Sequence, residues 1–170
     1  MKPELRKIDT KEYWDARFAG NGDEWQQDAI NQCLQHMQGV INLIPERYGF
    51  TALQGLTVLD VGCATGEGTA LLRQHAAEAE GIDYSKFAIE IAQKRFPEIH
   101  FEVKSVFEIT KDYDCIICNF VLRHLVARAE EGLRHLQKHC ERLVVTANEQ
   151  YGKPVYVLPA LEGKIYVYEN

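Results

Sequence analysis

The chain has 170 residues, of which 46% are hydrophobic and 26% are charged, and its net charge is −6. This length is enough for one domain with its own core, so we expect a single domain over residues 1–170. The acidic balance argues against general binding to a phosphate backbone, and we expect no nucleic-acid partner. No apolar run reaches membrane-spanning length, and the N-terminus lacks the apolar core of a signal peptide. We therefore expect a cytoplasmic protein with no membrane partner.

Residues 1–55 are expected to form a helical N-terminal cap. Gly20, Asn21 and Gly22 mark a break, and a helix is predicted from about residue 23 onward. Its apolar residues follow one another in steps of four and three, which places them in one stripe along the helix. The stripe consists of Ile30, Leu34, Met37, Ile41, Ile44 and Tyr48.

Residues 56–147 alternate short β-branched runs with helical patterns. Strands are predicted at 57–61, 78–83, 99–103, 113–118 and 142–147. Helices are predicted after Gly66, after Ser85, and from about Leu122 to Cys140. The apolar stripe of the last helix consists of Leu122, Val126, Ala129, Leu133, Leu136 and Cys140. Regular alternation of strand and helix predicts a parallel sheet that is covered on both faces.

Residues 148–170 are expected to form a terminal hairpin. Its strands are predicted at 155–158 and 164–169, with Gly163 in the turn. The segment that precedes the hairpin is too short for a parallel crossover, so these strands should join the sheet edge in antiparallel orientation.

The cysteine and histidine pattern indicates neither a disulfide framework nor a metal site. The five cysteines are odd in number and irregularly spaced, as in a reducing compartment. Cys115 and Cys118 lie in a predicted strand, where residues three apart point to opposite faces. His135 and His139 lie four apart on a predicted helix, but no third ligand is evident near them. We therefore expect no bound metal.

A glycine-rich turn follows the first predicted strand, in the segment VLDVGCATGEG. Gly62, Gly66 and Gly68 lie where this strand ends and a helix begins, which is where open α/β folds bind ligands. A dinucleotide fingerprint would need further glycines where the chain has Ala64 and Glu67, so NAD is disfavoured. No Lys followed by Ser or Thr completes a P-loop, which disfavours ATP and GTP as well.

Asp83 ends the second predicted strand, 21 residues after Gly62. A carboxylate at this position can accept hydrogen bonds from both hydroxyls of a ribose, and the adjacent Tyr84 would then lie against the adenine. An ordinary helix cap is the alternative for an Asp at a strand end.

Three segments together resemble a class I S-adenosylmethionine-dependent methyltransferase. They are VLDVGCATGEGTALL, GIDYS and YDCIICNFVLRHL, and the resemblance covers residues 58–147. The opening KEYWDARFAGNGDEW also resembles the lead-in of small bacterial members of that family. The resemblance implies an α/β Rossmann-like methyltransferase fold and S-adenosylmethionine as cofactor, with S-adenosylhomocysteine as product. We expect a mostly parallel seven-stranded sheet in the order 3-2-1-4-5-7-6, with an antiparallel terminal hairpin and helices on both faces.

The resemblance also implies a place for each site residue. The methionyl part of the cofactor would meet Tyr13, Trp14, Asp60, Gly62, Cys63, Ala64, Gly66 and the backbone carbonyl of Asn119. The nucleoside would meet Asp83 at the ribose, and Tyr84, Ser105 and Val106 at the adenine. Phe120 and His124 would lie at the mouth of the pocket.

The sequence departs from the family pattern at two places. The family usually has an acidic residue at the adenine where this chain has Ser105, whose hydroxyl accepts the same hydrogen bond without the assistance of charge. The usual helix between the fifth strand and the terminal hairpin is also missing. The acceptor pocket must therefore use the N-terminal helices, a partner chain or further sequence.

The expected activity is methyl transfer to a small-molecule acceptor. His124 is the candidate base if the acceptor must lose a proton, and a packed or solvated histidine is the alternative. A cofactor-binding subunit that has lost catalysis and needs a partner chain is the rival function. The acceptor and the oligomeric state stay open at this point.

Overall fold

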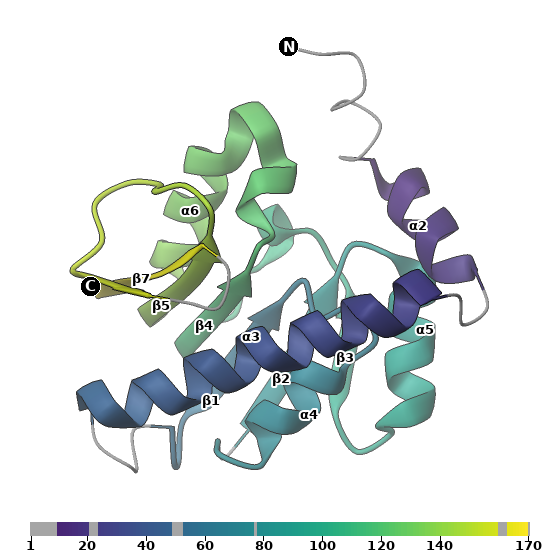
Figure 1. The fold of residues 1–170 in the computed structure, drawn as a ribbon, viewed down its shortest axis with the longest axis horizontal. Coiled ribbons are helices and arrows are strands. Elements are labelled where there is room, and N and C mark those ends of the chain that lie inside the picture. The colour runs from purple at the N-terminus through teal and green to yellow at the C-terminus, as the bar shows by residue number, and fades with distance from the viewer. Residues whose placement is uncertain (1–9, 21–23, 49–52, 77, 160–162, 170) are drawn as a thin grey trace.

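The computed structural model describes residues 10–20, 24–48, 53–76, 78–159 and 163–169. These residues form one seven-stranded sheet with helices packed on both of its faces (Figure 1). In chain order the elements are α2 (Lys11–Ala19), α3 (Glu24–Tyr48), β1 (Thr57–Val61), α4 (Glu67–Arg73), β2 (Glu78–Asp83), α5 (Lys86–Arg95), β3 (His100–Val103), the 3₁₀ helix η1 (Val106–Glu108), β4 (Tyr113–Asn119), the 3₁₀ helix η2 (Leu122–Arg128), α6 (Ala129–Lys138), β5 (Cys140–Ala147), β6 (Tyr156–Pro159) and β7 (Lys164–Glu169).

The strand order is β3-β2-β1-β4-β5-β7-β6, as the sequence predicts. Strands β1 to β5 run parallel, whereas β7 pairs antiparallel with both β5 and β6. Val61 at the end of β1 pairs with Ile82 of β2 and with Cys118 of β4. The carboxyl ends of these three strands therefore lie side by side at one edge of the sheet.

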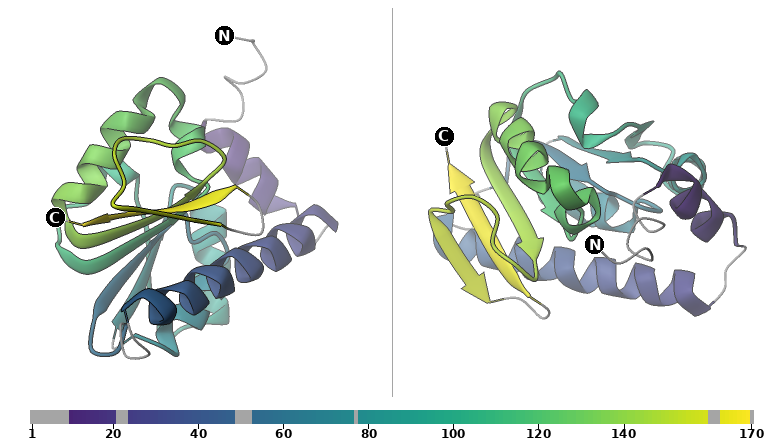
Figure 2. Two further views of the ribbon diagram at one scale, coloured as in Figure 1. Left: turned by 60° about the vertical axis from the view of Figure 1, so that its left-hand side comes forward. Right: turned by 90° about the horizontal axis from the view of Figure 1, so that it is seen from above.

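The two faces of the sheet are covered by different helices (Figure 2). Val58 and Ile117 point to the face that α3 and α4 cover, while Leu59 and Ile116 point to the face that α6 covers. Successive strand residues alternate between faces, so a strand buried on both sides must be apolar throughout. This requirement explains the continuous apolar runs that identify these strands in the sequence.

The apolar stripe predicted for α3 is confirmed as far as the structure describes it. Met37 and Ile41 are buried in the core, and Ile30 and Leu34 are half-buried. The side chains at positions 44 and 48 lie outside the described residues, as do residues 21–23 of the predicted break before the helix. The burial of this stripe fixes α3 across the sheet, next to the edge where the strands end.

The helix predicted from Leu122 to Cys140 is wrong as one continuous element. It is interrupted at Val126, which is exposed and has a φ of 47°. The interruption lets Leu125 fold back onto Gly132, where a Cβ would lie 2.4 Å from the Leu125 Cδ1 atom. Cys140 already belongs to β5. Periodicity alone does not reveal this kink, because both halves contribute apolar residues to the same core.

Residues 148–155 form no helix between β5 and β6, in agreement with the departure noted in the sequence. Within the described ranges, no helix is both long and apolar enough to cross a membrane. The five cysteines are free thiols. His139 contacts Asp112 and His135 contacts the Ile109 carbonyl, and among the described residues no three side chains gather into a metal site.

Candidate functional site

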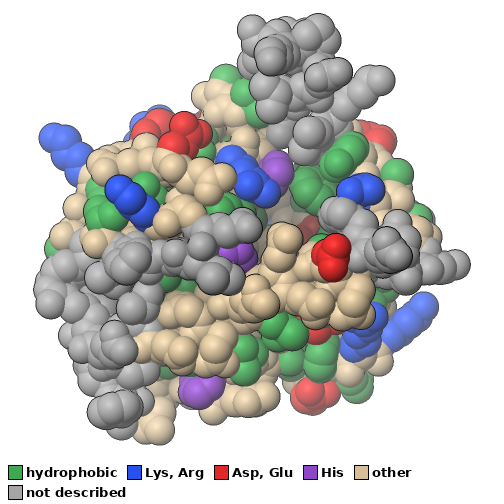
Figure 3. Space-filling view, in the orientation of Figure 1, with side chains coloured by type: hydrophobic (Ala, Val, Ile, Leu, Met, Phe, Trp, Pro, Cys, Tyr) green, Lys and Arg blue, Asp and Glu red, His purple; other side chains and the backbone are tan. Residues whose placement is uncertain are grey.

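A cavity of about 560 Å³ lies at the carboxyl ends of β1, β2 and β4. Its walls come from the segments that follow these strands, from the segment that follows β3, and from α2 and η2. In the space-filling view a hollow opens on this side of the molecule, with basic and histidine side chains at its edge (Figure 3). A cavity of this size accommodates a small-molecule ligand or cofactor. The lining includes ten residues that the sequence predicts for the site: Trp14, Gly62, Ala64, Asp83, Tyr84, Ser105, Val106, Asn119, Phe120 and His124.

The turn after β1 is tied to the end of β2. The backbone N–H groups of Gly62 and Cys63 both donate to the Ile82 carbonyl, at 2.8 and 3.0 Å. Gly62 has a φ of 76°, and a Cβ on it would lie 2.2 Å from the Val121 Cγ2 atom. Glycine is required here for its backbone conformation and because a side chain would collide with the segment after β4.

Asp83 joins this turn to the start of α5. Its Oδ2 atom accepts a hydrogen bond from the Ala64 N–H at 3.0 Å, and its Oδ1 atom accepts one from the Ser85 N–H at 2.8 Å. Burial raises the pKa of the carboxyl, while backbone N–H groups oppose that shift. Each carboxylate oxygen has a further lone pair, so Asp83 retains the capacity to accept hydrogen bonds from a ligand in the cavity.

Asp60 lies outside the cavity lining, although the resemblance places it at the methionyl group. It is buried under α4, where its Oδ2 atom accepts the Thr69 hydroxyl at 2.7 Å. Burial raises the pKa of Asp60 to about 7. Asp60 points to the sheet face that α3 and α4 cover, because it alternates with the two strand neighbours that point to the other face.

Three further predicted residues also lie outside the lining. Cys63 packs into the core between β3 and α5, and Gly66 caps α4 with a φ of 91°. A Cβ on Gly66 would lie 2.9 Å from the Phe101 ring, so this glycine permits packing between elements. The Tyr13 ring stands edge-on to Trp14, with 5.2 Å between centroids. Trp14 itself reaches the cavity wall.

The end of β4 carries a strained turn. Phe120 has a φ of 57°, and its N–H donates to the Thr146 carbonyl at 2.8 Å. The Asn119 side chain accepts the Thr146 hydroxyl at 2.6 Å. The Phe120 ring meets His36 of α3, with 4.6 Å between ring centroids. Contacts with β5 and α3 thus hold a conformation that non-glycine residues rarely adopt.

Ser105 organises the wall after β3. Its hydroxyl accepts the Phe107 N–H at 3.3 Å, and its own N–H donates to the Glu108 carboxylate at 2.7 Å. This reciprocal pair is a capping box, which fixes the first turn of η1. Val106 is buried behind it.

Helix α2 closes the cavity from the side of α5. The Asp15 Oδ1 atom accepts hydrogen bonds from the Ser85 hydroxyl at 2.7 Å and from the Lys86 N–H at 2.9 Å. A carboxylate at the start of a helix is favoured by the partial positive charge there. Through this contact α2 brings Trp14 and Phe18 to the cavity wall, and the Trp14 ring lies edge-on to His124 at 5.0 Å.

His124 is held by its neighbour Arg123. The Arg123 Nε–H donates to the His124 Nε2 atom at 3.2 Å, and the guanidinium lies 5.1 Å from the centroid of the Phe120 ring. Burial and the positive charge of Arg123 lower the pKa of His124 to about 4. The imidazole is therefore neutral at physiological pH, and the Nε2 lone pair is engaged by a cation.

Sequence reasoning missed the other ten lining residues: Phe18, Val61, Ile82, Lys104, Phe107, Val121, Leu125, Val126, Ala127 and Arg128. Most of them are adjacent in sequence to a predicted site residue. Extending each predicted segment by one residue would therefore have included them. Phe18 lies four residues after Trp14, on the same face of a helix. Residues 126–128 reach the cavity only because of the kink in η2, for which the sequence gives no signal.

Residues 53–149, more than half of the chain, match a family described as a methyltransferase domain. The chain belongs to this methyltransferase family. A ubiquinone biosynthesis O-methyltransferase of Coxiella burnetii (strain Dugway 5J108-111) is 29% identical over 132 residues. A trans-aconitate 2-methyltransferase of Deinococcus radiodurans is 30% identical over 125 residues. These alignments cover 74% and 67% of this methyltransferase chain. It spans 55% and 45% of the length of the two relatives.

Solved methyltransferases share the fold. The magnesium protoporphyrin IX methyltransferase of Synechocystis PCC 6803, crystallised with bound S-adenosylmethionine, superposes with a TM-score of 0.71 at 20% identity. The alignment covers 95% of this chain and 94% of that one. The crystal structure with S-adenosylhomocysteine gives a TM-score of 0.66 at 25% identity, over 84% and 73% of the two chains. Both forms of the cofactor are thus bound by structural relatives of this methyltransferase domain.

Proposed function

We propose that the chain binds S-adenosylmethionine in the cavity at the ends of β1, β2 and β4 and transfers its methyl group to a small-molecule acceptor. The observation that carries this proposal is the Asp83 carboxylate, which lies in the cavity wall and hydrogen-bonds the turn that follows Gly62. In a family of methyltransferase domains, a carboxylate in this place suits the two hydroxyls of the cofactor's ribose.

The remaining parts of the cofactor are assigned to the other predicted lining residues. Tyr84, Ser105 and Val106 would enclose the adenine. Gly62 and Ala64 would lie along the methionyl chain, whose ammonium would meet the backbone carbonyl of Asn119. The Asn119 side chain is already engaged by Thr146, which leaves the backbone for this contact.

The cavity fits such a ligand in size and chemistry. Its volume of about 560 Å³ is within the range of cofactor pockets. Asp83 supplies hydrogen-bond acceptors for the ribose, and aromatic side chains supply apolar walls for the adenine. S-adenosylmethionine, when bound, supplies a methyl group already activated on a sulfonium. The residues of the chain then bind, orient the two reactants and exclude water.

The cavity wall extends beyond the residues assigned to the cofactor. It continues past Trp14 to Phe18, Phe120 and His124. This extension supports a space for an acceptor next to the cofactor, and it favours an enzyme over a cofactor-binding subunit without catalysis. For His124 the contact with Arg123 favours a packed histidine over a general base.

Methyl transfer is tested with a metabolite extract and cofactor that is isotopically labelled in its methyl group. We expect mass spectrometry to detect labelled small molecules in the presence of the protein, and fewer of them with Asp83→Ala. Failure of the parent chain to label any metabolite at saturating cofactor would contradict the proposed transfer.

A further inference from the structure

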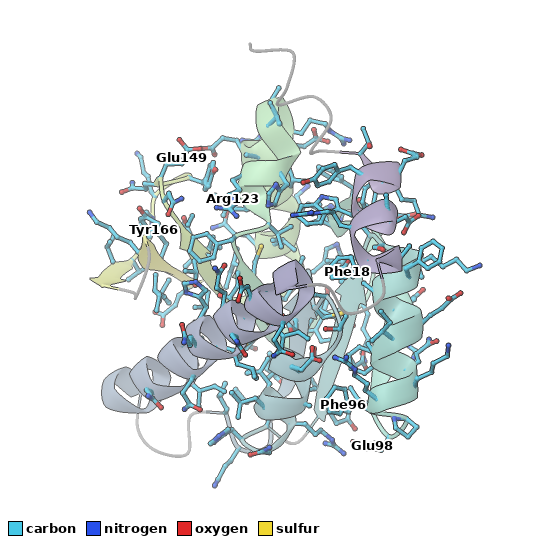
Figure 4. All side chains as sticks on the ribbon, turned by 45° about the vertical axis from the view of Figure 1, so that its right-hand side comes forward. Phe18, Phe96, Glu98, Arg123, Glu149 and Tyr166 are labelled. Carbon is cyan, nitrogen blue, oxygen red and sulfur yellow. The ribbon has the colours of Figure 1, made fainter. Side chains whose placement is uncertain are left out.

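Arg123 is exposed and does not itself line the cavity, but it contacts two residues that do. Its guanidinium lies over the Phe120 ring and its Nε–H is bonded to His124, and both of these neighbours line the cavity. Figure 4 shows Arg123 next to the end of β4, on the same side of the molecule as Glu149. The cation–π contact and the hydrogen bond keep this exposed charge beside the cavity lining.

No carboxylate among the described residues forms an ion pair with Arg123. The two cations of the cavity lining differ in this respect. Lys104 pairs with Glu102 at 2.6 Å, and Arg128 pairs with Glu131 at 2.7 Å. The Glu149 carboxylate accepts the Tyr151 hydroxyl at 2.7 Å instead of binding Arg123. The guanidinium therefore has N–H groups to offer to an anion that enters the cavity.

Among the described lining residues, the acceptor side of the cavity offers no free base. The Nε2 lone pair of His124 is engaged by Arg123. Asp83 is the one carboxylate among the described lining residues, and it is assigned to the ribose. An alcohol or phenol acceptor must lose its proton during transfer, and the lining residues that the structure describes provide no free group to take it. An ammonium would need the same help and would also be repelled by Arg123.

We propose that the acceptor is a small carboxylate whose charge is bound by Arg123 and whose oxygen receives the methyl group to form a methyl ester. The inference rests on the proposed function, because it concerns the acceptor half of the same cavity. A carboxylate is ionised at neutral pH, so it needs no base. Planar guanidinium and carboxylate groups also match in geometry, which favours this pairing.

The step balances without a proton acceptor. A lone pair of the carboxylate oxygen forms the new bond to the methyl carbon, and the carbon–sulfur bond breaks with its electron pair remaining on sulfur. The products are a methyl ester and S-adenosylhomocysteine, so the negative charge of the acceptor and the positive charge of the sulfonium are both neutralised. The apolar walls from Phe18 and Phe120 would favour this loss of charge.

Ligand binding tests the carboxylate site without turnover. The protein saturated with S-adenosylhomocysteine is titrated with benzoate, with its neutral analogue benzamide and with benzylamine, and binding is followed by ligand-observed NMR. We expect benzoate to bind at least about tenfold more tightly than benzamide, since hydrogen bonds to charged groups are the stronger ones. Benzylamine should not bind.

The variant Arg123→Gln should remove the preference for benzoate, and Arg123→Lys should restore part of it. Arg134→Gln is the matched control, because Arg134 is an exposed arginine of α6, whereas Arg123 contacts the lining residues Phe120 and His124. The thermal shift that S-adenosylhomocysteine produces should persist in all three variants. Equal affinities for benzoate and benzamide, or a preference that survives in Arg123→Gln, would overturn the proposal.

The type of bond that holds the labelled methyl group in the product gives a second test of the carboxylate acceptor. Methyl esters release labelled methanol in mild alkali, whereas methyl ethers and methylamines do not. We expect methanol release from the labelled metabolites, and alkali-stable label would overturn the carboxylate assignment while leaving methyl transfer intact. An absence of any label would contradict the proposed function instead, and the benzoate comparison would still decide the acceptor site.

Discussion

At the scale of single residues, the site depends on which atoms remain available once the chain has folded. Asp83 and Asp60 are both strand carboxylates near the glycine turn, yet Asp83 lies in the cavity wall and Asp60 lies under α4. The spacing from Gly62 predicts Asp83. The strand alternation that turns Asp60 away from the site is also visible in the sequence, whereas the resemblance places Asp60 at the methionyl group.

Asp60 should make stability depend on pH. Its pKa rises from 3.8 to about 7 on folding, so its favourable contribution is complete below about pH 4 and is lost as the pH rises through 7. Asp60→Asn has no such loss. We expect the free energy of unfolding of this variant, relative to that of the parent, to rise by about 1–4 kcal/mol from pH 5 to pH 8, since each pKa unit is worth about 1.4 kcal/mol.

Thermal unfolding of the ligand-free protein at these two pH values measures the effect. Asp114→Asn is the matched control. Hydrogen bonds from Thr57 lower the pKa of Asp114, so the ionised carboxylate stabilises the folded state at both pH values. The control should lose stability by a similar amount at each pH. A difference between Asp60→Asn and the parent that does not change with pH would contradict the assigned pKa.

His124 should remain neutral throughout the physiological range. Its pKa of about 4 results from burial and from the adjacent Arg123 charge. NMR titration of the imidazole protons should show no midpoint for His124 between pH 5.5 and 8, whereas in Arg123→Gln the midpoint should move upward. A midpoint for the parent residue near 6.5, the value of an exposed imidazole, would restore His124 as a candidate base.

At the scale of elements, the sequence predicts the strands to within about two residues, and the signal is strongest for the central strands β1 and β4, which are buried on both faces. Predicted and observed bounds coincide for β1, β2 and β7. The failure at 122–140 has a physical reason, since Gly132 admits Leu125 and the chain can turn at Val126. The resemblance places Trp14 at the pocket, but the Asp15 contacts that dock α2 were not predictable, because they join segments about 70 residues apart.

The contact of Asp15 with the start of α5 should control cofactor affinity. Asp15→Ala removes both hydrogen bonds and should release α2, which carries Trp14 and Phe18 away from the cavity wall. Hydrogen bonds to charged groups contribute about 1.5–3 kcal/mol, so we expect S-adenosylhomocysteine to bind about tenfold more weakly. Calorimetry should show no such loss for Glu12→Ala, an exposed acidic control on the same helix. Unchanged affinity in Asp15→Ala would mean that α2 does not contribute to the pocket.

At the scale of the whole molecule, the sheet order brings the ends of β1, β2 and β4 together, and many of the residues proposed for the site lie directly after these strands. Cofactor binding should therefore stabilise the native state as a whole. At about 100 times its dissociation constant a ligand contributes roughly 2.7 kcal/mol, which corresponds to about 5–11 °C in Tm for a chain of this size. S-adenosylhomocysteine should produce this shift and NADH should not. A comparable shift with NADH would contradict the choice of cofactor.

Calorimetric titration of S-adenosylhomocysteine into the parent chain and into Asp83→Ala tests the central claim most directly. Because the claim assigns both ribose hydroxyls to this carboxylate, the variant should bind about tenfold to a hundredfold more weakly. Asp112→Ala is the matched control, since it removes an exposed carboxylate that precedes β4, at the opposite edge of the sheet. The account predicts a loss in Asp83→Ala alone, and binding of that variant as tight as that of the parent would contradict it.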